Sequence, residues 1–324
     1  MRAAQLVARR RFDVGRFPVP PLEPGQVLVR TRLAAICGSD VKVVFGAIGP
    51  DRFPCPPGYP GHEAIGDVLE SRSPEHRPGD LVLTTPRPGT SRAFAERQVV
   101  PATQVVPVPP TSDLATMLMA QQLGTVLYAL KHFWTGPPGE TATVIGAGTA
   151  GLHFTQLLKG AGFGRVVVGD LHPHRLEAAR TLGADVAVVA RGESVVEATM
   201  DVTGGRGADL VVEAVGLDAT RAQAVRAVAF GGRIGLFGLP EHRGDAPFPF
   251  AEAFQRRPTI EISVGTQEEP GLVSFREAVR CIGAGEVDVS RLVTHRFALE
   301  QLAGAFALAG EPDGGAIKVA ITFD

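Results

Sequence analysis

Cysteine is scarce in this chain of 324 residues, and so are long apolar runs and excess charge of either sign. Three cysteines, Cys37, Cys55 and Cys281, are too few and too scattered for a disulfide framework. No stretch approaches the roughly 18 apolar residues of a membrane-spanning helix, and the first residues lack a signal-type apolar block. A formal net charge of −2 provides no basic field for nucleic acid or an anionic membrane. These absences predict a cytoplasmic protein without nucleic-acid or membrane partners.

The length suits two domains, and the residue pattern changes near Thr111, from short β-rich runs with prolines to segments at helical spacing. Before that point, short β-rich runs such as Val27–Val29 and Leu81–Leu83 alternate with proline-rich turns, which disfavour long helices. After it, apolar residues recur at helical spacing from Leu114 to Phe133, with Asp113 as a helix-start residue.

Strand-like and helix-like segments then alternate along the chain. Such a βαβα rhythm predicts an α/β fold with a doubly wound parallel sheet covered by helices on both faces. The expected strands are Thr141–Ile145, Val166–Val168, Leu210–Glu213 and Arg233–Phe237, and the expected helices are Ala150–Ala161 and Pro173–Leu182.

A glycine motif follows the first of these strands and opens a helix, which is the context that a dinucleotide-binding motif requires. Gly146 permits a tight turn, Gly148 lets the backbone approach a pyrophosphate, and Gly151 lets helix and strand pack closely. Thr149 and Ala150 complete this candidate clamp at a helix N-terminus. The alternative is an ordinary glycine-rich turn between a strand and a helix.

Asp170 ends the second strand, 24 residues beyond Gly146. A carboxylate there accepts hydrogen bonds from ribose hydroxyls and repels a 2′-phosphate, which favours NAD over NADP. Arg175 lies just downstream and could soften that repulsion. The alternative reading of Asp170 is a helix-capping acid before Pro173. Further candidate cofactor contacts are Val215, Gly216, Phe237 and Gly238.

Cys37 and the pair His62-Glu63 offer thiolate, imidazole and carboxylate groups, the ligands that catalytic zinc favours. Taken alone, a single cysteine is more often a structural core residue. The segments around these residues resemble the zinc-dependent alcohol and polyol dehydrogenase branch of the medium-chain dehydrogenase/reductase superfamily. The resemblance includes Cys-Gly-Ser-Asp at 37–40, Gly-His-Glu at 61–63, Gly79-Asp80, Ala-Phe-Ala-Glu at 93–96, the glycine motif, Gly-Gly-Arg-Ile at 231–234 and Thr-His-Arg-Phe at 294–297.

The resemblance implies a GroES-like β-barrel catalytic domain, residues 1–122 with 267–324, and a Rossmann domain, residues 123–266, with the active site in the cleft separating them. It implies that Cys37 and His62 bind zinc and that Glu63 can swing onto the metal. Ser39 would relay the substrate proton, and Asp40 would orient His62. A homodimer joined at edge strands around Thr259–Val264 is also expected, with a tetramer as the alternative.

Three departures from the family pattern stand out. Only 13 residues, none of them cysteine, separate Asp80 from Phe94, so the lobe that binds a structural zinc is expected to be absent. Gln121 stands where the third zinc ligand is expected, and a neutral amide is a poorer ligand than a carboxylate. Lys42 replaces a histidine of the proton relay, and it either acts as a base or is an ordinary solvent-facing lysine.

The leading hypothesis is therefore zinc-dependent hydride transfer between NAD and a small-molecule alcohol or carbonyl, with a secondary or polyol-type alcohol preferred. One alternative is a metal-free NAD(P)H-dependent reductase of the same superfamily. The other is a catalytically idle nucleotide-binding sensor, which the neutral Gln121 keeps open.

Overall fold

A computed structural model describes residues 1–46, 48–311 and 314–323. The chain forms two compact units, one of Met1–Thr125 with Gly265–Asp324 and the other of Val126–Val264. Within the described residues, no helix combines the length and the apolar character needed to cross a membrane.

The unit of residues 126–264 is built on a six-stranded sheet in which all neighbouring strands run parallel. The strand order reverses between β8 and β11, and ligands of such sheets bind outside the carboxyl ends of the strands at this switch point. In spatial order the strands are β10 (Val186–Val189), β9 (Arg165–Asp170), β8 (Thr141–Ile145), β11 (Ala208–Glu213), β12 (Val228–Leu236) and β13 (Thr259–Ile262).

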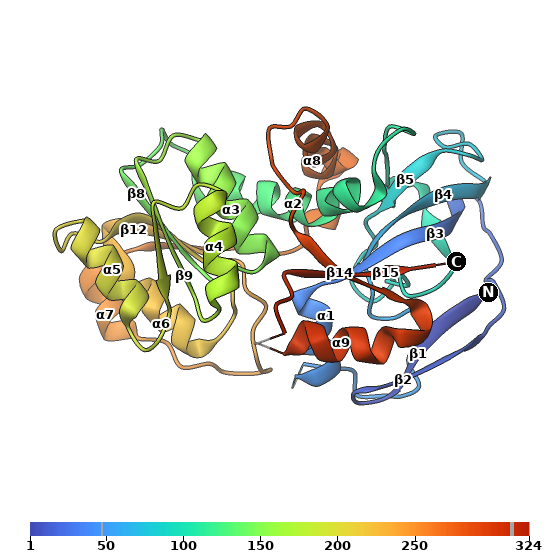
Figure 1. The fold of residues 1–324 in the computed structure, drawn as a ribbon, viewed down its shortest axis with the longest axis horizontal. Coiled ribbons are helices and arrows are strands. Elements are labelled where there is room, and N and C mark those ends of the chain that lie inside the picture. The colour runs from blue at the N-terminus through green and yellow to red at the C-terminus, as the bar shows by residue number, and fades with distance from the viewer. Residues whose placement is uncertain (47, 312–313, 324) are drawn as a thin grey trace. The chain divides into compact units, whose positions relative to one another are not determined.

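Helices cover both faces of this sheet (Figure 1). The central strands are rich in apolar residues because both of their faces are buried, as in β8, where all five residues are buried. One face carries α3 (Thr149–Gly160) and α4 (Pro173–Thr181); the other carries α5 (Ser194–Val202), α6 (Asp218–Ala227) and α7 (Phe250–Arg256). The predicted doubly wound α/β fold is confirmed.

The strand β12 begins five residues earlier than Arg233, where the sequence predicts it. Its pairing with β11 jumps from Ala208–Val228 to Leu210–Arg233, so the residues between bulge out of the ladder. Gly231 has a φ of 69° in this bulge, and Phe230 is 68% exposed. Gly231 and Gly232, which belong to a segment of the resemblance, thus form an irregularity inside the strand.

The other unit contains a two-stranded sheet and a larger seven-stranded one. The C-terminal strand β15 (Lys318–Thr322) pairs antiparallel with β3 (Gln26–Ile36), which joins the two ends of the chain in one sheet. The remaining strands of the large sheet are β14 (Val293–Ala298), β4 (Glu63–Ser71), β5 (Leu81–Thr84), β6 (Arg97–Pro101) and β7 (Val105–Pro107); β1 (Arg2–Ala8) and β2 (Arg11–Arg16) form the small sheet.

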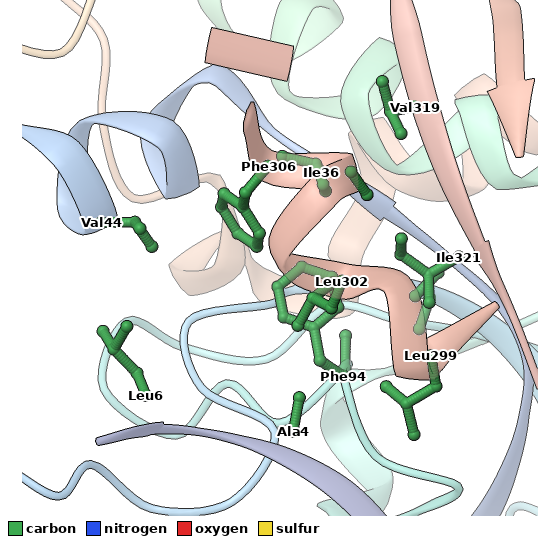
Figure 2. Packing of buried hydrophobic residues seen from close by; sticks show 14 of the residues in the cluster. Ala4, Leu6, Ile36, Val44, Phe94, Leu299, Leu302, Phe306, Val319 and Ile321 are labelled. Carbon is green, nitrogen blue, oxygen red and sulfur yellow. The ribbon is translucent and has the colours of Figure 1, made fainter. Parts of the chain in front are cut away.

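The core of this unit packs around α9 (Leu302–Gly310), as Figure 2 shows. Phe94 and Phe306 meet edge to face with ring centroids 5.5 Å apart, and Leu302 and Ile321 pack beside them. Phe94, which lies in the Ala-Phe-Ala-Glu segment of the resemblance, is thus a packing residue with no exposed surface. The core fixes the C-terminal segment against β3.

The remaining helices are α1 (Gly38–Phe45), α2 (Leu114–Phe133) and α8 (Val273–Gly283). The prediction of α2 is confirmed, and the carboxylate of Asp113 accepts a 2.8 Å hydrogen bond from the Thr116 N–H at its first turn. Short 3₁₀ turns lie at Ala102–Gln104, Thr266–Glu268, Pro270–Leu272 and Leu299–Gln301.

Candidate active site

Cys37 and His62 come together because they flank two neighbouring strands. Cys37 follows β3 and precedes α1, while His62 precedes Glu63, the first residue of β4. Ala35 pairs with Glu63 across the antiparallel ladder, so the end of β3 lies beside the start of β4. One potential ligand atom from each of Cys37, His62 and Glu63 lies within 4.8 Å of the other two.

The Asp40 carboxylate contacts both Cys37 and His62. Its Oδ2 accepts a 3.0 Å hydrogen bond from the Cys37 N–H, and its Oδ1 lies 3.0 Å from Nδ1 of His62. The side chain is only 2% exposed, so it is fixed by its surroundings. A carboxylate on one ring nitrogen orients the imidazole and leaves Nε2 as the donor for a metal. This arrangement, with a thiol beside it, fits the chemistry of zinc.

The pKa of His62 is displaced by its neighbours. Burial lowers the pKa, but the Asp40 carboxylate and the Cys37 sulfur outweigh burial and raise it well above the usual histidine value. A metal at Nε2 therefore competes with a proton, as is general for imidazole ligands.

Glu63 is held by a residue that the sequence analysis did not identify. Nζ of Lys318 lies 2.9 Å from Oε1 and 2.8 Å from Oε2 of Glu63, and the two side chains are 2% and 1% exposed. Burial alone lowers the pKa of Lys318, but the charges of Glu63, Cys37 and Asp40 raise it above its usual value. Lys318 thus remains protonated and occupies both oxygens of the carboxylate that was expected to be mobile.

The other predicted residues of this half lie on two helices. Ser39 and Lys42 are half-buried on α1, on either side of Asp40 in sequence. Gln121 is 1% exposed on α2, and its Nε2 has no hydrogen-bond partner among the described residues. A buried amide left unsatisfied calls for a bound group or water as its partner.

The glycine loop in the other unit has the backbone shape that the motif requires. Gly146 has a φ of 99°, a conformation that favours glycine. A Cβ at Gly151 would lie 1.7 Å from the Gly146 carbonyl oxygen, which forbids a side chain there, whereas a Cβ at Gly148 would meet nothing within 4 Å. The open space at Gly148, directly before the first residue of α3, fits a pyrophosphate group.

Asp170 braces this loop from the neighbouring strand. Its Oδ2 accepts a 2.7 Å hydrogen bond from the Ala147 N–H, and its Oδ1 accepts one of 2.9 Å from the His172 N–H. The nearest guanidinium nitrogen of Arg175 lies 4.0 Å from Oδ2. Each carboxylate oxygen has a second lone pair, so ribose hydroxyls can still be accepted.

The four remaining candidate cofactor residues lie at the ends of the next two strands. A Cβ at Gly238 would lie 2.1 Å from the Gly216 nitrogen, so the two loops touch through their backbones. A Cβ at Gly146 would meet Cγ2 of Val215 at 2.6 Å, and Phe237 packs edge to face on Phe154 of α3. All the predicted loops of this unit therefore lie at the carboxyl ends of the strands of its parallel sheet.

Comparisons with known proteins agree with this geometry. The family model for zinc-binding dehydrogenases matches residues 150–282, and that for the alcohol dehydrogenase GroES-like domain matches residues 23–110. An alcohol dehydrogenase of Cupriavidus necator is 27% identical over 99% of this chain and 98% of its own length. The structure of the alcohol dehydrogenase TADH from Thermus sp. ATN1 superposes with a TM-score of 0.87 at 26% identity, covering both chains fully.

The chain belongs to the medium-chain dehydrogenase/reductase superfamily. Other relatives include sorbitol dehydrogenase of Bacillus subtilis, 26% identical over 99% of this chain and 97% of that enzyme, and L-arabinitol 4-dehydrogenase of Aspergillus niger, 29% identical over 93% and 86%. The expected GroES-like domain is confirmed, and the chain is similar to oxidoreductases that act on alcohols and polyols.

A second group of potential metal ligands in this superfamily member consists of Asp218, Glu241 and His242. Its donors are already used: Asp218 contacts Arg221 and accepts from Nε2 of His242 at 3.0 Å, and Glu241 accepts from the Asp218 N–H at 2.7 Å. These contacts connect the start of α6 to the loop after β12. The Cys37 group, which contains a thiol, is the better metal centre.

Proposed function

We propose that this superfamily member is a zinc-assisted, NAD-dependent oxidoreductase that interconverts a secondary or polyol-type alcohol and its carbonyl. The observation that carries the proposal is the Asp40 carboxylate, which fixes both Cys37 and His62 in a donor set suited to zinc. The alcohol and polyol dehydrogenases among its relatives support the substrate class.

Cys37 and His62 would hold the zinc, with Gln121 as the third candidate ligand. A zinc ion there supplies Lewis-acid chemistry for the alcohol–carbonyl interconversion. Because Lys318 occupies both oxygens of Glu63, that carboxylate does not reach the metal without first leaving its ion pair. The Ser39 hydroxyl takes the substrate proton in this proposal and passes it toward Lys42. We propose one catalytic zinc per chain and no structural zinc.

The loop of Gly146–Gly151 would hold the dinucleotide, with Thr149 and Ala150 at the first turn of α3. The carboxylate of Asp170 supports NAD over NADP, since it would face a 2′-phosphate with negative charge. The guanidinium of Arg175 reduces this discrimination because it lies only 4.0 Å from the same carboxylate.

Metal content and turnover test the proposal together. The wild type and Gln121→Glu are purified, their zinc is measured by mass spectrometry, and a panel of secondary alcohols and polyols is assayed with NAD. About one zinc per chain with turnover of the panel supports the proposal. Binding of NADH without turnover of any alcohol or carbonyl would instead favour a nucleotide sensor.

The metal-free NAD(P)H-dependent reductase remains the second candidate, favoured by two observations at the metal site. Gln121 is neutral, and the ion pair with Lys318 neutralises Glu63, so Cys37 is the one anionic donor left among the four predicted ligands, all of which the structure describes. A wild type without zinc that reduces enoyl or quinone compounds would establish this candidate.

We also propose a homodimer joined through β13. This strand lies at the edge of the six-stranded sheet, and apolar side chains at its end face solvent: its last residue, Ile262, is 69% exposed, and Val264, two residues beyond it, is 77% exposed. Unpaired edges of this kind associate with a second strand. Light scattering of the wild type and of Ile262→Lys tests the interface, and a wild-type monomer at micromolar concentration would refute it.

A further inference from the structure

Glu213 is a buried carboxylate that the proposed chemistry does not use. It is the last residue of β11 and has no exposed surface. Among the described residues no lysine, arginine or histidine forms an ion pair with it. Burying an unpaired carboxylate is costly unless several donors surround it, so the hydrogen bonds of Glu213 indicate what it does.

One oxygen of this carboxylate holds the loop that follows β11. Oε1 accepts hydrogen bonds from the N–H groups of Val215 at 2.8 Å and Gly216 at 2.6 Å, and from the Thr220 hydroxyl at 2.8 Å. The other oxygen, Oε2, has no partner among the described residues. All the observed bonds of the side chain therefore pass through a single oxygen, which a glutamine also has.

The main chain of the same residue holds the loop that follows β12. The Glu213 carbonyl oxygen accepts hydrogen bonds from the N–H groups of Phe237 at 2.9 Å and Gly238 at 3.0 Å. These two loops touch where a Cβ on Gly238 would meet the Gly216 nitrogen. A single residue thus organises two segments that are more than twenty residues apart in the sequence.

These segments lie on one side of the point where the strand order reverses. The glycine loop and Asp170 follow β8 and β9 on the other side. In such sheets each half receives one mononucleotide of a dinucleotide. The half that Glu213 organises would accordingly receive the mononucleotide opposite the one near Asp170.

We propose that Glu213 is a positioning residue for the second mononucleotide of the bound dinucleotide, acting by holding the Val215–Gly216 and Phe237–Gly238 loops in one arrangement. This inference rests on the proposed dinucleotide binding. It adds a residue that acts through backbone N–H groups, without itself touching the reacting atoms.

The test compares three variants by NADH fluorescence titration and by hydrogen exchange of the unliganded protein. Glu213→Ala should raise the Kd for NADH at least tenfold and speed the exchange of the amides of Val215 and Gly216. Glu213→Gln, which keeps one oxygen acceptor, should stay within about threefold of the wild-type Kd. The matched control is Asp209→Ala, because Asp209 accepts the N–H groups of Glu140 and Thr141 at the opposite end of β11. It should lower the Tm and leave the Kd unchanged.

Several results would overturn the inference. They are a Glu213→Ala variant that binds NADH as the wild type does, a Glu213→Gln variant as weak as Glu213→Ala, or a Kd that rises equally in Asp209→Ala. If Glu213→Ala does not fold, exchange in the wild type decides: unprotected amides at Val215, Gly216, Phe237 and Gly238 would refute the loop order. Failure of the wild type to bind NAD(H) would refute the proposed function, whereas the exchange data would still report on the loops.

Discussion

Replacing Lys318 by methionine tests how the residues of the candidate metal site are held together. The variant leaves the carboxylate of Glu63 buried without a cation, because both of its oxygens contact Nζ of Lys318 and its side chain is 1% exposed. Removing one partner of a buried ion pair costs about 3–5 kcal/mol. For a unit of this size that loss corresponds to a fall in Tm of roughly 6–20 °C.

The assay is thermal unfolding of chelator-treated protein, so that bound metal does not contribute. The matched control is Lys159→Met, which removes a pair of similar geometry: Nζ of Lys159 lies 2.7 and 2.9 Å from the oxygens of Asp185, but the side chains are 40% and 34% exposed. Exposed pairs contribute about 0–1 kcal/mol, so this control should melt near the wild type. Burial, with distance held constant, then explains the difference.

The double variant Glu63→Gln with Lys318→Met tests whether the lost stability comes from the unpaired charge of Glu63. It removes both charges, so it should recover much of the stability lost in Lys318→Met. Added zinc should also raise the Tm more in Lys318→Met than in the wild type, since the freed Glu63 becomes available as an anionic ligand. A Lys318→Met protein that unfolds within about 2 °C of the wild type would refute the buried-pair reasoning.

Three further predictions follow from the same structure. Iodoacetamide at pH 8 should label Cys37 fastest and zinc should protect it, because burial raises the pKa of the thiols of Cys55 and of Cys281, the latter to about 11; equal labelling of all three would contradict this. Asp170→Asn should raise the affinity for NADPH relative to NADH about tenfold, or ~1.4 kcal/mol, and an unchanged ratio in fluorescence titrations would remove Asp170 from cofactor choice. Burial works against the charge of Asp185, but hydrogen bonds from Lys159 and the Val166 N–H lower its pKa. The ionised Asp185 therefore stabilises the folded state above about pH 4, and this stabilisation is lost as the pH falls through the pKa of the folded protein. The Tm of Asp185→Asn should accordingly fall less on acidification than the Tm of the wild type, and an equal fall in both proteins would contradict this.

The sequence predicts the nucleotide-binding unit well because its signals are local. Parallel strands buried on both faces leave apolar runs such as Val166–Val168. Within the loop, Gly151 is required because it lies against the carbonyl of Gly146, five residues earlier. The bulge in β12 was missed because it depends on pairing with another strand, which local sequence signals do not report. Gly231 and Gly232 have the same composition whether they form a turn or an irregular strand, and only pairing with β11 distinguishes the two.

The candidate metal site was predicted less completely because its contacts are long-range. Cys37, Asp40 and His62 lie in recognisable segments, but Lys318 reaches Glu63 across 255 residues of sequence. Its only signal is one lysine in the apolar run Ala316–Ile321. A charge in such a run indicates a buried partner without naming it. Glu213, a charged residue directly after the apolar residues Leu210–Val212 of β11, likewise indicates a buried carboxylate with partners that the sequence does not name.

The ion pair between Lys318 and Glu63 changes what Gln121 is expected to do. With Glu63 neutralised, a zinc ion held by Cys37, His62 and Gln121 would have a single anionic ligand. Fewer anionic ligands weaken metal binding and leave the metal a stronger Lewis acid. Gln121→Glu should therefore increase zinc occupancy while lowering kcat per bound zinc, as measured by mass spectrometry and alcohol oxidation on the same preparation. If occupancy and kcat per zinc rise together, Gln121 weakens the site without tuning its chemistry.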